Sequence, residues 1–488
     1  MSFLAISIFA QTEAEISGKR YKRIVIRNAT VVDGNGTPAT GPKDIVIEND
    51  KIVQVVGLNP VAVKRGTAKR PAKGEVEIDA TGKFVIPGLI NAHGHTHNGR
   101  GGIPMPIEYC RKLWLASGQT TIRELAAPKE AIKWREQSAK NEIAAPRMFV
   151  YITFPGANSP EQARQKVREI KQLGADGIKL FAVDRDIMEA LMDEAKKQGL
   201  RVAHHTGVAE TNTWDDIKFG TTSIEHWYGV PEAAIPNGRQ NYPADYVYSD
   251  EVDRFRYAGR LWREADWGRL MKVFDAMIEA NVAWDPTLNI YEASRDLQKA
   301  QTDPAFKDYL HPTLEKFFIP NPANHGSYFI GWTSTDEAYW KENYRIWMRA
   351  LREFERRGGL VGAGEDAGFI YKMYGFGLIR ELELQQEAGF PALMVIKHAT
   401  GNNAKILGVE DYIGRIRVGY KADLLVVNGN PLEDLKVLYP TGTETVIDGK
   451  IVKTGGIEWT IKDGIPFHAP TLAKEVRELV AKARSSKK

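Results

Sequence analysis

The chain has one cysteine, Cys110, in 488 residues, and this excludes an intramolecular disulfide and any paired-cysteine motif. No apolar run approaches the roughly 18 residues that a membrane-spanning helix needs. A Gly-x-Ser-x-Gly nucleophile turn and a Walker A phosphate loop are also missing from the sequence. The chain therefore lacks the serine, cysteine and phosphate-loop signatures of several large enzyme classes.

Excess charge of one sign is missing too. The net charge is only +4 at pH 7, and lysine and arginine are spread along the chain, so nucleic acid is not an expected partner. With 43% apolar and 26% charged residues, the composition is that of a globular protein with a large core, and the length predicts two domains. We expect a small-molecule substrate and a homo-oligomer.

The N-terminal residues 1–21 allow two interpretations. An apolar run from Phe3 to Ala10 precedes a polar stretch, as in the remnant of a secretory signal peptide, but a basic segment before it is missing. The alternative is a simple N-terminal arm. A cytoplasmic location and an exported or periplasmic one therefore both stay open.

Strand-like and helical patterns divide the rest of the chain. Short strands with Gly, Asn and Asp turns fill residues 22–82 and 413–465, which predicts antiparallel β structure at both ends. Between them, in residues 83–412, strand-like runs alternate with helical stretches, as expected for βα units with a parallel sheet. An aromatic-rich segment, about 230–345, exceeds what a simple βα barrel needs, and residues 466–488 look like a C-terminal helix and tail.

Two histidines follow an apolar run near the start of the central region. His93 and His95 are two residues apart, and in a strand such residues point to the same face. Imidazole is a common metal ligand, so the pair forms half of a metal site. A chance surface pair is the alternative for an isolated His-x-His.

The surrounding motifs resemble those of the amidohydrolase superfamily. The first motif is Pro87-Gly88-Leu89-Ile90-Asn91-Ala92-His93-Gly94-His95, with Asn91 where many members have Asp. The other three are Gly174-Ala175-Asp176-Gly177-Ile178-Lys179, Ser223-Ile224-Glu225-His226, and Gly414-x-Ile416-x-x-Gly419-x-x-Ala422-Asp423-Leu424. The resemblance spans roughly residues 22–455. It implies an α/β fold, a (β/α)₈ TIM barrel beside a composite β-sandwich built from both chain ends.

The resemblance also implies a ligand set of His93, His95, Lys179, His205, His226 and Asp366. In such enzymes the lysine takes up CO₂, and the carboxylated lysine bridges two divalent metal ions, which here would be Zn²⁺. Burial lowers the pKa of a lysine, and the neutral amine is nucleophilic. Asp366 would also act as the general base. A lysine reaching solvent at a strand end is the alternative for Lys179.

Several neighbouring residues need separate interpretations. Because adjacent strand residues face opposite sides, only one of His204 and His205 should face the barrel interior, and the family pattern favours His205. By the same rule Glu225 should face away from the site and be structural. Glu365 stands where relatives usually have Thr, and His97 is interpreted as a loop or substrate-facing residue.

The expected activity is hydrolysis of a C–N bond in an amide, dipeptide or cyclic amide, since the motifs are closest to imidazolonepropionase-like and Xaa-Pro dipeptidase-like members. Arg100, Tyr228 and Tyr291 are candidates for substrate contact. A mononuclear zinc deaminase of a heterocycle is one alternative, although deaminases of this superfamily generally lack the lysine. A catalytically silent binding scaffold is the other.

Overall fold

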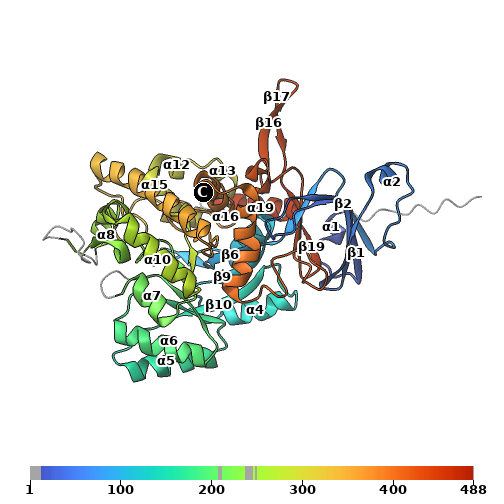
Figure 1. Ribbon diagram of the computed structural model, residues 1–488. Coiled ribbons are helices and arrows are strands. Elements are labelled where there is room, and N and C mark those ends of the chain that lie inside the picture. Colours follow the sequence, from blue (N-terminus) through green and yellow to red (C-terminus); the bar gives the residue numbers. More distant parts are fainter. Residues whose placement is uncertain (1–12, 207–210, 237–245, 248–249, 487–488) are drawn as a thin grey trace, which may run out of the picture.

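The computed structural model describes residues 13–206, 211–236, 246–247 and 250–486, so the expected signal remnant at residues 1–10 lies outside the described residues. Two sheets organise the chain. One is a ring of parallel strands surrounded by helices, and the other is a mixed sheet to its side, at the right of Figure 1.

Seven parallel strands form the ring, in chain order from first to last. They are β6 (Leu89–Gly94), β9 (Gln119–Glu124), β10 (Arg147–Thr153), β11 (Gly177–Leu180), β12 (Arg201–His204), β13 (Ser223–Glu225) and β14 (Ala283–Asp285). Residues 360–366 lie between β14 and β6: Trp284 N donates to Leu360 O at 2.9 Å, and Ala92 N donates to Ala363 O at 3.1 Å. This segment takes the place of the eighth strand and confirms the predicted barrel class.

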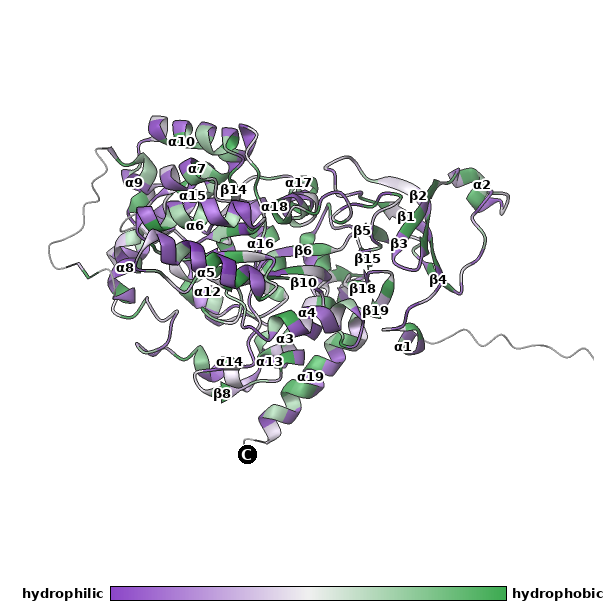
Figure 2. Ribbon diagram, turned by 90° about the horizontal axis from the view of Figure 1, so that it is seen from below, coloured by the Kyte–Doolittle hydropathy of each residue, from purple (hydrophilic) through white to green (hydrophobic). Residues whose placement is uncertain are grey.

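The barrel strands are short and buried on both faces. Every residue of β6, β9 and β11 is buried, as expected where helices cover a parallel sheet. The covering helices are amphipathic: α5 (Pro160–Gln172) begins at Ser159, whose side chain accepts a hydrogen bond from Gln162 N. Figure 2 shows β6 mostly hydrophobic and α5 mostly hydrophilic, so the core lies between strands and helices.

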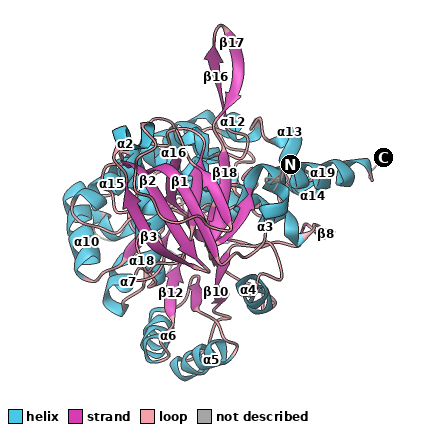
Figure 3. Cartoon of the chain, turned by 90° about the vertical axis from the view of Figure 1, so that its right-hand side faces the viewer, coloured by secondary structure: helices cyan, strands magenta, loops and turns pink. Residues whose placement is uncertain are grey.

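Helices surround the barrel (Figure 3). In addition to α5 they are α3 (Ile107–Ala116), α4 (Ala131–Ala139), α6 (Arg185–Lys197), α7 (Thr213–Phe219), α10 (Trp267–Glu279), α15 (Ser334–Arg356), α16 (Phe376–Glu387), α17 (Ala392–Lys397) and α18 (Asn403–Leu407). The segment expected to exceed a simple barrel supplies further short helices, namely α8 (Glu251–Ala258), α9 (Leu261–Glu264), α11 (Glu292–Arg295), α12 (Leu297–Gln301), α13 (Phe306–Tyr309) and α14 (Pro312–Phe317).

The mixed sheet joins both ends of the chain, as the predicted fold class requires. Its order is β19-β18-β15-β5-β1-β2-β3, and β4 pairs with β1. The strands are β1 (Arg23–Val31), β2 (Thr40–Glu48), β3 (Lys51–Gly57), β4 (Val76–Asp79), β5 (Phe84–Pro87), β15 (Leu424–Val427), β18 (Ile457–Lys462) and β19 (Ile465–His468). Strand β5 pairs with β15 and leads through Gly88 into β6. A Cβ on Gly88 would lie 2.2 Å from Thr120 Oγ1, so only glycine fits this junction.

The remaining elements lie at the periphery. A hairpin of β16 (Thr443–Ile447) and β17 (Lys450–Thr454) projects from the body at the top of Figure 1. Helix α19 (Ala469–Ser485) packs against α3, while α1 (Glu13–Ile16) and α2 (Pro60–Lys64) are short. Within the described ranges, none of the helices has the length and apolar character needed to cross a membrane.

Candidate metal centre

The six predicted ligands meet at the carboxyl ends of the barrel strands. They line one cavity of about 540 Å³ and come from β6 and the loop after it, from β11, from the residues that follow β12 and β13, and from the closing segment: His93, His95, Lys179, His205, His226 and Asp366. The carboxyl end is where (β/α)₈ enzymes place their active sites. Arg100, Tyr228 and Tyr291 line the same cavity.

Three of the four histidines are held by an oxygen at Nδ1. His93 Nδ1 lies 2.7 Å from Glu225 Oε2, His95 Nδ1 lies 2.7 Å from the Leu125 carbonyl oxygen, and His226 Nδ1 lies 2.6 Å from Thr287 Oγ1. A carbonyl or carboxylate oxygen only accepts, so Nδ1 of His93 and His95 carries a proton, and Nε2 is the atom that each ring turns toward Asp366. Burial lowers the pKa of His93 to about 4 and that of His226 well below its ordinary value, which keeps both rings neutral at pH 7.

Asp366 faces the first histidine pair. Its Oδ1 lies 3.0 Å from His95 Nε2 and 3.6 Å from His93 Nε2, and its Oδ2 lies 3.7 Å from His226 Nδ1. Burial alone would raise the pKa of this carboxyl, but the adjacent His93 and His95 outweigh burial and hold the pKa well below its usual range. His93, His95 and Asp366 thus present ligand atoms close enough together for one metal ion.

Lys179 is buried in the middle of the group with its amine unsatisfied. Only 1% of the residue is exposed, and Nζ has no hydrogen-bond partner within the described ranges. Burial lowers the pKa of Lys179 to about 8. A buried amine without a partner is costly, so this position fits a lysine that is completed by a further group, as a metal-bridging carbamate would complete it.

The two adjacent histidines separate as the strand rule predicts. His204 ends β12, is fully buried, and its Nδ1 lies 2.6 Å from Asp216 Oδ1. His205 lines the cavity, its ring stacks on Tyr228 at 4.4 Å, and it lies 4.7 Å from the His226 ring. The structure therefore brings His205, and not His204, beside the other candidate ligands.

The predicted orientation of Glu225 is wrong. Its carboxylate points into the barrel, where it accepts hydrogen bonds from His93 and, at 2.7 Å, from Arg123 Nη2. Strand β13 ends at Glu225 and His226 has a φ of 65°, so the alternation of faces does not extend across this pair. Arg123 also lies 3.3 Å from Asp285. Arg123 and Asp285 were not identified from the sequence, although a charged residue inside a buried strand signals a buried partner.

Glu365 does not join the ligand group. Its carboxylate accepts hydrogen bonds from Trp114 Nε1, from Gln119 Nε2 and from Gly375 N, on the side of α3 and α16. Burial raises the pKa of Glu365 to about 7. The residue that replaces the usual Thr thus anchors the closing segment against the helices.

Aromatic residues form much of the remaining wall. Tyr228 and Tyr291 share a hydrogen bond of 2.7 Å between their hydroxyl groups, and His97 Nδ1 lies 2.5 Å from Tyr374 Oη. Residues of the 230–345 segment that the sequence did not single out also line the cavity, namely Arg254, Phe255 and His325. The segment therefore shapes the substrate space.

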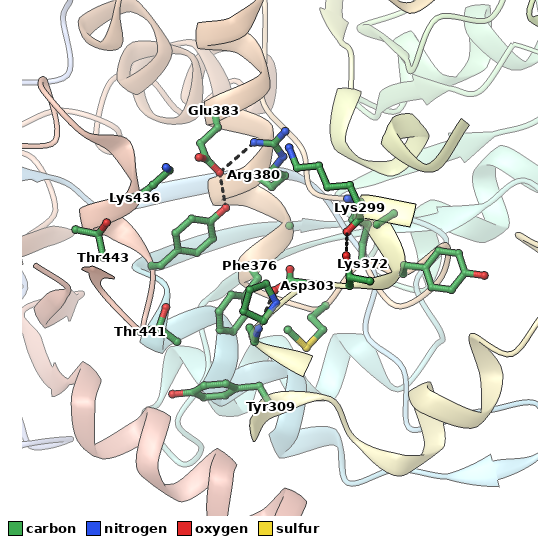
Figure 4. A pocket seen from close by; sticks show the side chains of 18 of the residues that line it. Lys299, Asp303, Tyr309, Lys372, Phe376, Arg380, Glu383, Lys436, Thr441 and Thr443 are labelled. Carbon is green, nitrogen blue, oxygen red and sulfur yellow. Dashed lines mark hydrogen bonds and ion pairs between the residues drawn. The ribbon is translucent and has the colours of Figure 1, made fainter. Parts of the chain in front are cut away.

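A second cavity, of about 680 Å³, lies beside α16 and is shown in Figure 4. Several of its polar side chains are paired: Glu292 lies 2.8 Å from Lys372 and 2.6 Å from Arg380, and Glu383 accepts from Tyr439 at 2.6 Å. None of the described residues that line it is a histidine. Among the described residues, the candidate metal-binding groups are at the barrel mouth instead.

Comparison with known proteins supports the resemblance seen in the motifs. The model of the amidohydrolase family matches residues 333–452. An adenine deaminase of Bacillus velezensis is 24% identical over 230 residues, which are 42% of this chain and 39% of that protein. A putative prolidase from Bifidobacterium longum superposes with a TM-score of 0.64 at 22% identity, covering 96% of this chain and all of that one.

A Xaa-Pro dipeptidase with methionine bound in its active site superposes with a TM-score of 0.63 at 21% identity, covering 91% of this chain and 100% of that one. These likenesses show a shared fold. The match to the curated deaminase spans about two fifths of its length.

Proposed function

We propose that this chain, an amidohydrolase by motifs, fold and family match, hydrolyses a C–N bond with a metal-activated water. The observation that carries the proposal is the convergence of four histidines, one carboxylate and one unsatisfied amine on a single cavity. Neutral imidazoles with Nδ1 held by an outer oxygen are the usual form of histidine that binds metal through Nε2.

The donor set suits two divalent ions, with zinc the best match to imidazole and carboxylate ligands. His93, His95 and Asp366 would hold one ion and His205 and His226 the other, and a carboxylated Lys179 would complete the set. Two such ions would supply an acidified water and a polarised substrate carbonyl. Carboxylation forms a bond between the neutral Lys179 Nζ and the carbon of CO₂ and releases one proton.

The residues of the chain perform the proton transfers and the positioning. Asp366, whose pKa is held low, accepts the proton of the attacking water and delivers it to the leaving nitrogen. Tyr228 and Tyr291 offer hydroxyl groups to the substrate from the His205 side of the cavity. Glu225 fixes the orientation of His93, and Thr287 fixes that of His226.

The second candidate is a mononuclear deaminase, which the similarity to an adenine deaminase favours. Lys179 speaks against it, because a deaminase with one metal has no use for an unsatisfied amine at the centre of the site. A silent scaffold would not need a full set of ligand atoms. The homo-oligomer and the lack of a nucleic-acid partner stay predictions.

Metal content per chain, measured by plasma mass spectrometry on protein purified without chelators, separates these candidates. About two ions per chain, with hydrolysis of dipeptides, N-acyl amino acids or cyclic amides, would support the proposal. About one ion together with ammonia release from heterocycles would favour the deaminase. No metal after addition of zinc and bicarbonate would leave the scaffold.

A further inference from the structure

Arg100 is held rigidly at the edge of the metal-site cavity. It ends the short strand β7 (Gly99–Arg100), which pairs with β8 (Ile103–Pro104). Its Nε donates to the Gly368 carbonyl oxygen at 2.9 Å. The centre of its guanidinium lies 5.1 Å from the ring of Phe317 and also 5.1 Å from that of Phe369. One hydrogen bond and two aromatic faces thus fix the plane of the guanidinium.

Tyr374 also interacts with this guanidinium, but one of its two terminal nitrogens is unpaired within the described ranges. Nη2 is buried and makes no hydrogen bond to any described residue. An arginine cannot escape the cost of burial by losing its proton, so an unpaired buried N–H group calls for an acceptor. The parallel N–H groups of a guanidinium match the paired oxygens of a carboxylate or a phosphate.

The loop that holds Arg100 also holds Asp366. Gly368 follows Asp366 by two residues and has a φ of 102°, and a Cβ there would lie 2.3 Å from Tyr374 Oη. This close approach keeps the loop against the body of the barrel. Arg100 is therefore hydrogen-bonded to the same short segment that carries Asp366, the residue that delivers a proton to the leaving nitrogen.

We propose that Arg100 Nη2 binds a carboxylate on the amine half of the substrate, which narrows the substrate class to N-acyl amino acids and dipeptides with a free carboxyl terminus. This inference rests on the proposed hydrolase function, because the amine half of the substrate is the half whose nitrogen receives a proton from Asp366. The acyl half then lies toward the aromatic wall of Phe181, Tyr228 and Phe255 near His205.

The test uses paired substrates and Arg100→Gln. N-benzoyl and N-acetyl amino acids and dipeptides are each compared with the matching carboxamide, and kcat/KM is measured on zinc-loaded protein. We expect the native enzyme to prefer the carboxylate by about 30-fold, which is the factor for ~2 kcal/mol. Arg100→Gln should reduce this ratio to about one through a higher KM, with the carboxamides unaffected. Arg100→Lys, which keeps the charge and loses the fork, should retain part of the preference.

Arg349→Gln is the matched control, since the guanidinium of Arg349 also lies over an aromatic ring, that of Trp267, but this residue does not line the metal-site cavity. It should leave the carboxylate preference intact. Equal ratios in the native enzyme and in Arg100→Gln would overturn the inference and leave the hydrolase standing. If neither these pairs nor cyclic amides are hydrolysed, the hydrolase proposal fails. Calorimetry with L-phenylalanine and L-phenylalaninamide then decides on Arg100: only the carboxylate should bind, and only when Arg100 is present.

Discussion

Replacing Lys179 by Met should stabilise the metal-free protein and abolish the proposed binuclear site. The amine is buried and has no hydrogen-bond partner among the described residues, and burial lowers its pKa from 10.5 to about 8. One pKa unit equals about 1.4 kcal/mol, so keeping this group charged in the folded state costs about 3 kcal/mol below pH 8. Methionine has a similar shape and no charge, so it removes that cost.

The sign follows from proton binding. Between pH 8 and 10.5 the unfolded chain binds the lysine proton and the folded chain does not, so the stability of the native protein rises with pH in this window. The advantage of Lys179→Met should therefore be fully present at pH 7 and vanish as the pH approaches 10.5. Urea denaturation of chelator-treated protein at several pH values measures it.

Lys462→Met is the matched control. Burial lowers the pKa of Lys462 to about 8 as well, but its Nζ donates to Ser138 O at 2.6 Å and to Ser138 Oγ at 3.0 Å, away from the metal site. This variant removes the same charge but also two hydrogen bonds, so its gain in stability should be smaller than that of Lys179→Met, and it should keep its metal. With zinc and bicarbonate, the native protein should bind about two ions and Lys179→Met one or none. The reasoning is refuted if Lys179→Met binds two ions, or if it gains no more stability than Lys462→Met in the metal-free protein.

Three further substitutions test the surrounding groups. Glu225→Gln leaves Arg123 with a weaker buried partner, so we expect the free energy of unfolding, measured by denaturation, to fall by about 3 kcal/mol. It also weakens the support of His93, so metal affinity, measured by competition with a chelator, should fall roughly 10- to 100-fold. Asp366→Asn should lower kcat by at least about 100-fold with most of the metal retained, as single-turnover kinetics would show; an unchanged kcat would rule out a proton-transfer role. Tyr291→Phe removes the hydrogen-bond partner of Tyr228 and should raise KM a few-fold at constant metal content, whereas an unchanged KM would show that the hydroxyl pair does not meet the substrate.

Residues within regular strands were predictable from the sequence. The spacing of His93 and His95 placed both on one face, and they do converge on Asp366. The separation of His204 from His205 followed from the same alternation. These predictions succeed because a strand has a fixed period of two, which any single sequence displays.

Residues that depend on pairing across the barrel were not predictable in this way. Arg123 donates hydrogen bonds to Glu225 and Asp285, which lie more than 100 positions away in the chain. Nothing in the local pattern of β9 says which carboxylates will face its arginine. The wall formed by Arg254 and His325 likewise depends on where the long insertion folds back over the barrel mouth.

The ends of two strands show why local rules stop at the site itself. His226 and Asp366 have φ values of 65° and 46°, a left-handed conformation that is uncommon outside glycine. Each is held by a hydrogen bond to another part of the barrel, from His226 N to Asp285 O and from Asp366 N to His93 O, both 2.8 Å long. These hydrogen bonds therefore hold the left-handed backbone conformation and turn both side chains toward the site. They outweigh the preference of the two residues for a negative φ. Such strain persists where the surrounding structure enforces it, and here it is located at two of the six proposed ligands.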